Sequence, residues 1–180
     1  MTMNVMACDL EYVQVSGGRH IMAKCAIVDM WCDIVLNLTV RPNERVTNYV
    51  TKITGLRQGD LDFGMPYDTA LRVVKDVLST PDIVAFHDPT NDLKVLNWSP
   101  ECVVDTSRMS YLIDRGNFSR RPSEGVGLKK LASVLLNTDI QGGFHSPVED
   151  AITTMKLYKL SAGLECCYIR LKSGTGSNTE

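Results

Sequence analysis

The chain has 180 residues, 44% of them hydrophobic, and a formal net charge of −2, which together suit one globular domain. The charge argues against the strongly basic surface of a non-specific duplex-binding protein, although a narrow site for a few nucleotides of one strand stays open. No stretch is apolar for long enough to span a bilayer, and residues 1–10 lack the features of a signal peptide. We therefore expect an intracellular protein with no membrane partner.

The cysteines lack the spacing of zinc ligands, because none of them forms a C-x-x-C pair. Four of the six lie in apolar, strand-like runs, where a free cysteine behaves as a small hydrophobic residue. We therefore expect reduced, buried thiols. The positions are Cys8, Cys25, Cys32, Cys102, Cys166 and Cys167.

The first third of the chain is typical of an antiparallel sheet. Residues 5–15 and 21–31 are apolar and β-prone, and the segment 16–18 between them, Ser-Gly-Gly, predicts a hairpin. Residues 33–40 alternate apolar and polar side chains, and Pro42 ends this third strand.

Helices and short buried strands alternate in the rest of the chain. Apolar residues recur at helical spacing from Tyr67 until Pro81 closes the segment. The short apolar run that follows is typical of a buried parallel strand. The elements predicted after it are a strand over 82–86, a helix over 91–98, a strand over 102–106, a helix over 106–114, a polar loop over 115–127 and a helix over 128–136.

The last helix has the clearest start. Ser146 is a suitable N-cap, Pro147 suits the first helical position, and Glu149 completes a capping box. Its apolar stripe would be Val148, Ile152, Met155 and Tyr158. We expect one domain over residues 1–168 and, because the composition turns to Ser, Gly, Thr and Asn, a disordered tail over 169–180.

Asp9 and Glu11 lie inside the first predicted strand, separated by one residue. The strand period places both carboxylates on one face, where like charges repel unless a cation lies between them. A divalent metal ion is the natural candidate. The alternative is a solvated strand end, because the D-x-E pattern also occurs by chance.

Two further segments carry acidic residues where ligands bind. Asp92 follows the strand over 82–86, and the carboxyl ends of such strands are binding positions in open α/β sheets. Asp150 lies in the first turn of the last helix, with His145 just before its N-cap. Each has a structural alternative: Asp88 or Asn91 could simply cap a helix, and the helix dipole favours an acidic residue at 150.

The combination is more specific than its parts. Four carboxylates without soft ligands indicate a hard cation, Mg²⁺ or Mn²⁺. Two such ions about 3.5–4 Å apart can stabilise both the attacking and the leaving oxygen of a phosphodiester displacement. A histidine is a suitable base for the attacking water.

The order of these pieces resembles that of the DEDDh 3′→5′ exonucleases, which have a ribonuclease H-like fold. The segment 145–151, His-Ser-Pro-Val-Glu-Asp-Ala, is similar to the branch of interferon-induced and Rex-type RNA exonucleases. The similarity covers residues 7–160. It includes Arg41-Pro42 and the four segments 46–49, 53–56, 104–106 and 128–132.

The resemblance implies a mixed five-stranded sheet, with strands 1–3 antiparallel and strands 4–5 parallel, flanked by helices. It implies hydrolysis of single-stranded RNA, with DNA also open, from the 3′ end to nucleoside 5′-monophosphates, and it favours a nuclear location. Asp9 would bridge two divalent cations, Mg²⁺ or Mn²⁺, and His145 would be the general base. Glu11 and Asp150 would complete the shell of the first ion, and Asp92 would serve the second.

The resemblance also implies substrate contacts. Leu10, Tyr12 and the turn Thr54-Gly55-Leu56 would hold the 3′-terminal nucleotide, and His87 and Arg108 are further candidates. Basic residues of the polar loop and the helix after it would follow the phosphate backbone, unless they are only a solvated surface. These residues are Arg115, Arg120, Arg121, Lys129 and Lys130.

The sequence departs from the branch at four positions next to the motifs, which leaves nucleotide preference open: Tyr12, Gln14, Phe86 and Leu93. None of them removes a metal ligand. The alternative function is a non-catalytic module for nucleic-acid or protein interaction that retains the exonuclease fold.

Overall fold

A computed structural model describes residues 3–119 and 125–162 of the chain. The helices are α1 (Thr51–Thr54), α2 (Tyr67–Leu78), α3 (Thr90–Leu96), α4 (Ser110–Arg115), α5 (Leu128–Leu136) and α6 (Pro147–Ser161). The strands are β1 (Val5–Val15), β2 (His20–Asp29), β3 (Ile34–Arg41), β4 (Val46–Asn48), β5 (Met65–Pro66), β6 (Ile83–Phe86) and β7 (Val103–Asp105). The predicted tail over 169–180 lies outside the described residues, as do Cys166 and Cys167.

The strands form one mixed sheet in the order β5-β3-β2-β1-β6-β7, with β4 paired to β1. β1, β2 and β3 are antiparallel neighbours, and β6 and β7 continue the sheet parallel to β1. The predicted mixed α/β sheet is therefore confirmed. Its five predicted strands are joined by two short ones, β4 and β5, which have too few residues to show a hydrophobic period.

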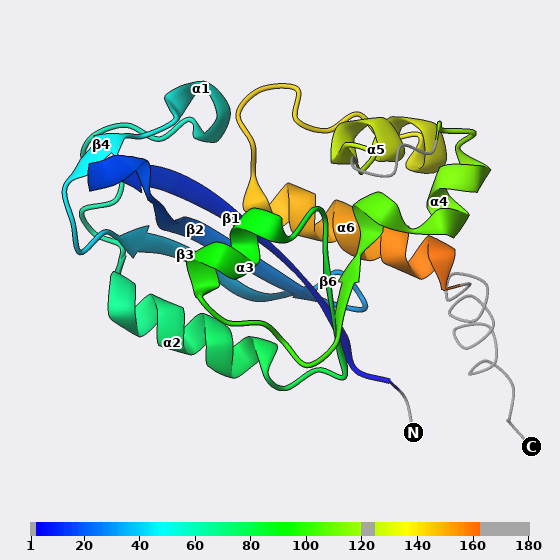
Figure 1. Ribbon diagram of the computed structural model, residues 1–180, viewed down its shortest axis with the longest axis horizontal. Helices are drawn as coiled ribbons and strands as arrows, with labels where there is room; N and C mark the ends of the chain where they lie inside the picture. The colour runs from blue at the N-terminus through cyan, green and yellow to red at the C-terminus, as the bar shows by residue number, and fades with distance from the viewer. Residues whose placement is uncertain (1–2, 120–124, 163–180) are drawn as a thin grey trace, which may run out of the picture.

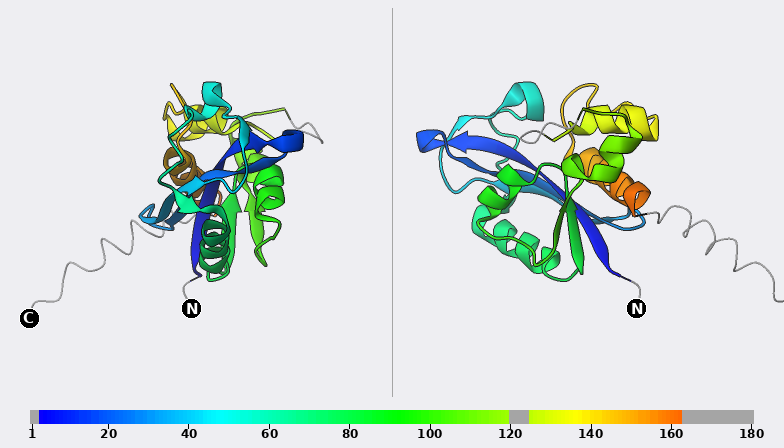
Figure 2. Two further views of the ribbon diagram at one scale, coloured as in Figure 1. Left: turned by 90° about the vertical axis from the view of Figure 1, so that its left-hand side faces the viewer. Right: turned by 45° about the vertical axis from the view of Figure 1, so that its right-hand side comes forward.

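Helices cover both faces of the sheet (Figures 1 and 2). α2 and α3 pack on one face, against a core that includes Cys8, Leu10 and Phe86. α6 crosses the other face, where Ala7 of β1 contacts the cluster that contains Met155. α4 and α5 pack on the outer side of α6, so that this helix lies between the sheet and a further layer.

Because α6 lies between the sheet and the layer of α4 and α5, two of its faces are buried instead of the single apolar stripe that the sequence predicts. Ile152, Met155 and Tyr158 face the sheet as predicted. Leu157, on another side of the helix, is fully buried against α5 and α4. An amphipathic pattern therefore identifies only one of the two packed faces of α6.

Two local predictions need correction. The helix predicted over 106–114 is a 3₁₀ turn over Thr106–Arg108 followed by α4, because the Asp105 carboxylate accepts a hydrogen bond from the Ser107 N–H and caps the turn separately. Ser146 caps α6 through the Glu149 N–H as predicted. The Glu149 carboxylate, however, accepts a hydrogen bond from the Gln141 N–H at 3.0 Å, so its side chain fastens the preceding loop.

No helix in the described ranges has both the length and the apolar content that crossing a membrane would need. The described cysteines are free; Cys8 and Cys25 are buried, whereas Cys102 is exposed.

Candidate active site

The carboxylates of Asp9 and Glu11 interrupt an otherwise apolar face of β1. On this face Ala7 belongs to the core under α6, and Val13 belongs to a second core with Leu56. β6 runs beside β1 only as far as the pair Ala7 and Ala85, so the strand that would flank Asp9 has almost ended. The end of β6 thus opens a cleft beside the two carboxylates, as expected at the carboxyl ends of parallel strands.

Asp92 reaches the same cleft from the first turn of α3, which follows β6 directly. The turn between them contains Asp88, whose φ is +53° and whose N–H donates to the Asp105 carboxylate at 3.0 Å. The Asp92 side chain is buried and lines the cleft together with Tyr12 of β1. The turn after β6 therefore positions Asp92 against the strand that carries Asp9.

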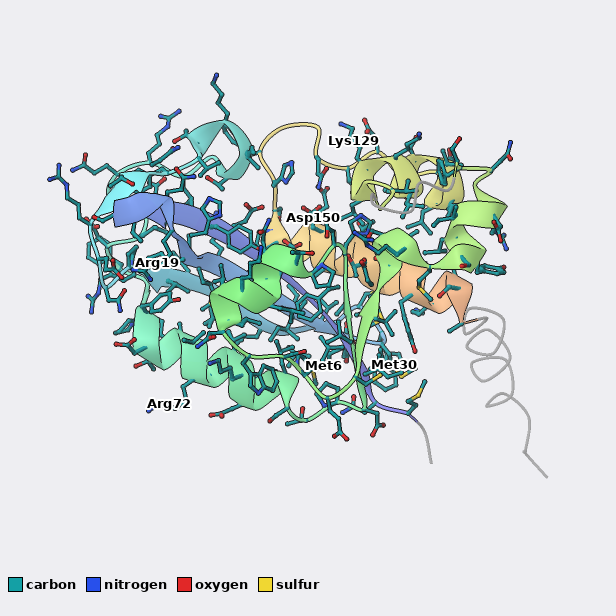
Figure 3. All side chains as sticks on the ribbon, viewed as in Figure 1. Met6, Arg19, Met30, Arg72, Lys129 and Asp150 are labelled. Carbon is teal, nitrogen blue, oxygen red and sulfur yellow. The ribbon has the colours of Figure 1, made fainter. Side chains whose placement is uncertain are left out.

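Asp150 and His145 come from the start of α6, and Figure 3 labels Asp150 at that end of the helix. The His145 Nδ1 atom lies 3.8 Å from the Asp150 Oδ2 atom and 4.0 Å from the Glu11 Oε1 atom. One ligand atom from each of these three residues lies within 4.8 Å of the others. The loop before α6 and the strand β1 thus meet at one point.

The electrostatics of the cleft favour a cation. Burial, followed by repulsion from Asp92, Asp150 and Glu11, raises the pKa of the Asp9 carboxyl well above its usual range. Burial and the charge of Asp150 raise the pKa of Glu11 to about 7, although Lys24 acts in the opposite direction. Four carboxyl groups that resist joint ionisation need a positive charge between them.

Burial also raises the pKa values of the other two carboxyl groups, Asp92 and Asp150. Burial raises the pKa of Asp92 to about 6, although the Tyr12 hydroxyl acts in the opposite direction. Burial also raises the pKa of Asp150, although the Gln141 amide and His145 oppose it. The Asp150 Oδ1 atom is buried without a hydrogen-bond partner among the described residues, and a divalent ion would satisfy it. The donor set fits a hard cation.

These side chains line a cleft of about 390 Å³. The residues that line it are Asp9, Leu10, Glu11, Tyr12, His20, Val50, Ile53, Thr54, His87, Asp88, Asn91, Asp92, Leu128, Gln141, His145 and Asp150. All five catalytic candidates from the sequence are included. The apolar and polar parts of the cleft lie side by side, which suits a nucleoside joined to a phosphate.

Some of the predicted substrate contacts line the cleft and others lie outside its lining. Leu10, Tyr12, Thr54 and His87 line the cleft. The His87 Nδ1 atom lies 2.9 Å from the Thr106 hydroxyl, which ties the ring to the core, and burial lowers the His87 pKa.

Three predicted contacts, Gly55, Leu56 and Arg108, lie outside the cleft lining, and their contact with substrate stays a prediction. Leu56 is buried in the core around Val13, because the turn after α1 directs its side chain inward. Gly55 lies against Phe144 and outside the cleft lining. Arg108 is ion-paired with Asp105 at 3.3 Å, also outside the cleft lining.

The basic residues expected on the phosphate backbone contact protein groups. Lys129 donates to the Gln141 carbonyl at 3.1 Å and lies 3.9 Å from Asp139; Figure 3 labels it at the start of α5. Lys130 lies over the Phe118 ring, and Arg115 donates to the Tyr111 hydroxyl. Arg120 and Arg121 lie outside the described residues.

Gln141 is a functional candidate that the sequence did not reveal. Its side-chain amide donates to the Asp150 Oδ2 atom at 3.0 Å, and its backbone N–H donates to Glu149. It therefore orients one of the carboxylates from outside the acidic set. A glutamine in a Gly-rich loop has no spacing signal, and only the three-dimensional contact identifies it.

Known proteins resemble this chain in sequence and in fold. The RNA exonuclease 4 of Xenopus laevis is 32% identical over 157 residues, which cover 86% of this chain and 36% of that protein. The RNA exonuclease 4 of Candida glabrata is 35% identical over 158 residues, with 86% and 58% covered. No family model matches the sequence.

Among solved structures, the Pan2 catalytic unit of Neurospora crassa matches with a TM-score of 0.74 at 23% identity, covering 98% of this chain and 30% of that one. The Saccharomyces cerevisiae Pan2 module in complex with AAGGAA RNA matches with a TM-score of 0.75 at 20% identity, with 98% and 33% covered. The Pan2 structures show the ribonuclease H-like fold of this chain.

The chain resembles the DEDD-type 3′–5′ exonuclease family in sequence and in fold. The chain spans 36% and 58% of the length of the two RNA exonuclease 4 relatives. A family of this kind depends on divalent metal ions, and Glu11, His145 and Asp150 form a candidate group for holding one. 

Proposed function

We propose that the chain is a metal-dependent 3′→5′ exonuclease that hydrolyses single-stranded RNA to nucleoside 5′-monophosphates. One observation carries this proposal: ligand atoms of Glu11, His145 and Asp150 converge within 4.8 Å in a cleft that Asp9 and Asp92 also line. A base and four carboxylates in one cleft are the parts that phosphodiester hydrolysis requires.

Two divalent cations, Mg²⁺ or Mn²⁺, would be held by Asp9, Glu11, Asp92 and Asp150. When bound, such ions neutralise charge on the phosphate and make water easier to deprotonate. The buried, unpartnered Oδ1 atom of Asp150 and the raised pKa values of the carboxyl groups support this assignment.

His145 acts as the general base. Its side chain is 35% exposed at the edge of the cleft, so an attacking water can reach the ring. The imidazole takes a proton from this water while the oxygen attacks phosphorus and the bond from phosphorus to the 3′ oxygen breaks. The carboxylates of Asp150 and Glu11, near the Nδ1 atom, stabilise the resulting positive charge on the ring.

The terminal nucleotide would occupy the apolar part of the cleft. Leu10 and Tyr12 lie on β1, and Ile53 and Thr54 lie on the short helix α1 opposite. Apolar and aromatic contacts of this kind tolerate every base, because every base has an aromatic face. The site would therefore hold a strand end with little preference for sequence.

RNA is the proposed substrate because the sequence relatives are named RNA exonuclease 4 and the yeast Pan2 module was solved with AAGGAA RNA. The test is a comparison of matched RNA and DNA oligomers, with chromatography of the released products. Nucleoside 5′-monophosphates released faster from RNA would support the proposal. Equal or faster cleavage of DNA would refute RNA as the preferred substrate, and nucleoside 3′-monophosphates would refute the mechanism.

A further inference from the structure

The loop that leads to His145 rests on α1. A side chain at Gly55, which follows α1 with a φ of +71°, would place its Cβ atom 2.7 Å from two ring atoms of Phe144. The adjacent His145 N–H donates to the Ile53 carbonyl at 2.8 Å. Two successive residues of the loop therefore contact the same turn, and Figure 1 shows α1 beside the loop before α6.

The loop is also attached before its glycines. Ile140 is buried in the core that contains Leu157, and Gln141 forms hydrogen bonds with Glu149, Asp150 and Lys129. Gly142 and Gly143 follow it, and a Cβ atom added at either would meet nothing within 4 Å. Because two glycines leave the backbone permissive, the contacts at α1 and the start of α6 together hold the backbone at His145.

α1 also faces the cleft. Val50, Ile53 and Thr54 line it, and the Thr54 hydroxyl stiffens the turn by donating to the Tyr49 carbonyl and accepting from the Leu56 N–H. A nucleotide that contacts this turn thus contacts the element that supports the His145 loop.

The Phe144 side chain contributes little to the core. It is 59% exposed and belongs to none of the buried clusters among the described residues. Its ring lies against Gly55, where a Cβ atom would come within 2.7 Å of the ring. Only a glycine at position 55 therefore leaves room for the ring in this place. An exposed aromatic ring on a glycine next to a catalytic residue is better explained by positioning than by stability.

We propose that Phe144 is a positioning residue for His145: its ring on Gly55, together with the hydrogen bond from His145 to Ile53, fastens the general base to the turn that lines the nucleotide cleft. The inference rests on the proposed exonuclease function. Because a displacement of about 1 Å in a catalytic group can cost about 100-fold in rate, loss of this contact should lower turnover.

The test compares Phe144→Ala, Phe144→Leu and Phe63→Ala on single-stranded RNA. Phe63 is fully exposed and provides a matched control for removing a surface phenyl ring. Phe144→Ala should lower kcat about 10- to 100-fold with KM within about twofold. Its melting temperature should stay within about 3 °C of the wild type. Phe144→Leu should restore part of kcat, and Phe63→Ala should match the wild type. A kcat for Phe144→Ala equal to that of Phe63→Ala would overturn the proposal.

A second measurement does not depend on activity. The chain has three histidines, so selective ¹⁵N labelling gives three backbone amide signals, and His145→Ala assigns one of them by its loss. In Phe144→Ala the His145 amide should exchange with solvent faster, because its hydrogen bond to the Ile53 carbonyl loosens, while the amides of His20 and His87 keep their exchange rates. An unchanged exchange rate at His145 would overturn the proposal. If the wild type degrades no RNA, the proposed function fails, and this exchange measurement alone decides whether Phe144 positions His145.

Discussion

Asp9 and Glu11 occupy alternate positions of β1, and burial together with repulsion from Asp150 and Asp92 raises the pKa values of both carboxyl groups. A cation among these carboxylates relieves this repulsion. The strand period predicts their shared face from sequence alone. Their burial and the approach of Asp150 depend on α6 crossing that face, which no local pattern shows.

We predict that Asp9→Asn and His145→Ala each remove most of the activity while the fold persists. Asp9→Asn removes a carboxylate that we assign to the cations, and it should abolish tight Mn²⁺ binding in calorimetry. His145→Ala should lower kcat by about 10²- to 10⁴-fold, which is the usual contribution of a general base.

Asp62→Asn, at an exposed position outside the cleft, is the control for losing one carboxylate. Near-normal turnover by purified His145→Ala protein would refute the role of the base. Unchanged Mn²⁺ affinity in Asp9→Asn would refute the assignment of the ligand.

Gln141 has a role that only the contact with Asp150 reveals. Groups that orient a metal ligand typically contribute about 10- to 100-fold to metal affinity. We therefore expect Gln141→Leu to weaken Mn²⁺ binding by at least about tenfold in calorimetry. Gln58→Leu, on an exposed loop, should bind as the wild type does. Equal affinities of the two variants would contradict the role.

At the level of single elements, the start of α6 holds the N-cap Ser146 between the two site residues His145 and Asp150. Ser146 accepts from the Glu149 N–H at 3.5 Å, which is a long bond. Ser146→Ala should therefore destabilise the protein by about 0.5–1 kcal/mol, at the low end for an N-cap, as measured by denaturant unfolding. Ser99→Ala, outside any helix, is a suitable control. A loss above about 2 kcal/mol would show that Ser146 does more than cap the helix.

Elements with a long hydrophobic period could be predicted. The strand β1 and the helix α5 begin and end at the residues that the pattern indicates, and α2 begins at Tyr67 as expected but ends at Leu78, before Pro81. Shorter elements could not, because their bounds depend on single side chains such as Asp105, whose cap separates the turn after β7 from α4. The turn after α1 could not be predicted either: Leu56 packs in the core there, and Gly55 contacts the Phe144 ring.

At the scale of the molecule, residues 9, 92 and 150 meet because β6 lies parallel to β1 and α6 crosses both. The order of the motifs in the sequence was sufficient to predict the mixed sheet and its family. The contact between α1 and the loop before α6 joins residues about 90 positions apart without any shared pattern, and therefore required the structure. The proposed intracellular location and the disordered tail stay predictions.

The raised pKa of Glu11 predicts how stability depends on pH. The folded pKa of about 7 exceeds the ordinary value of 4.5, so the folded state favours the protonated carboxyl. This contribution is fully present below about pH 4.5 and is lost as the pH rises through about 7. The shift corresponds to at most about 3 kcal/mol.

In EDTA the wild type should therefore be less stable at pH 8 than at pH 5, and Glu11→Gln should reduce this difference. At pH 8 added Mn²⁺ should make the wild type more stable than Glu11→Gln, because the ion stabilises the ionised wild-type site. Thermal unfolding of both proteins at the two pH values measures this. A larger decrease between pH 5 and pH 8 for Glu11→Gln than for the wild type would contradict the account.

The most direct test of the proposed exonuclease activity is a time course on a 5′-labelled single-stranded RNA, run with Mn²⁺ or with EDTA, beside the Asp9→Asn protein. We expect a ladder that shortens one nucleotide at a time from the 3′ end, only with the metal and only with the wild type. Degradation that continues in EDTA, or RNA that stays intact with Mn²⁺ and wild-type protein, would contradict it.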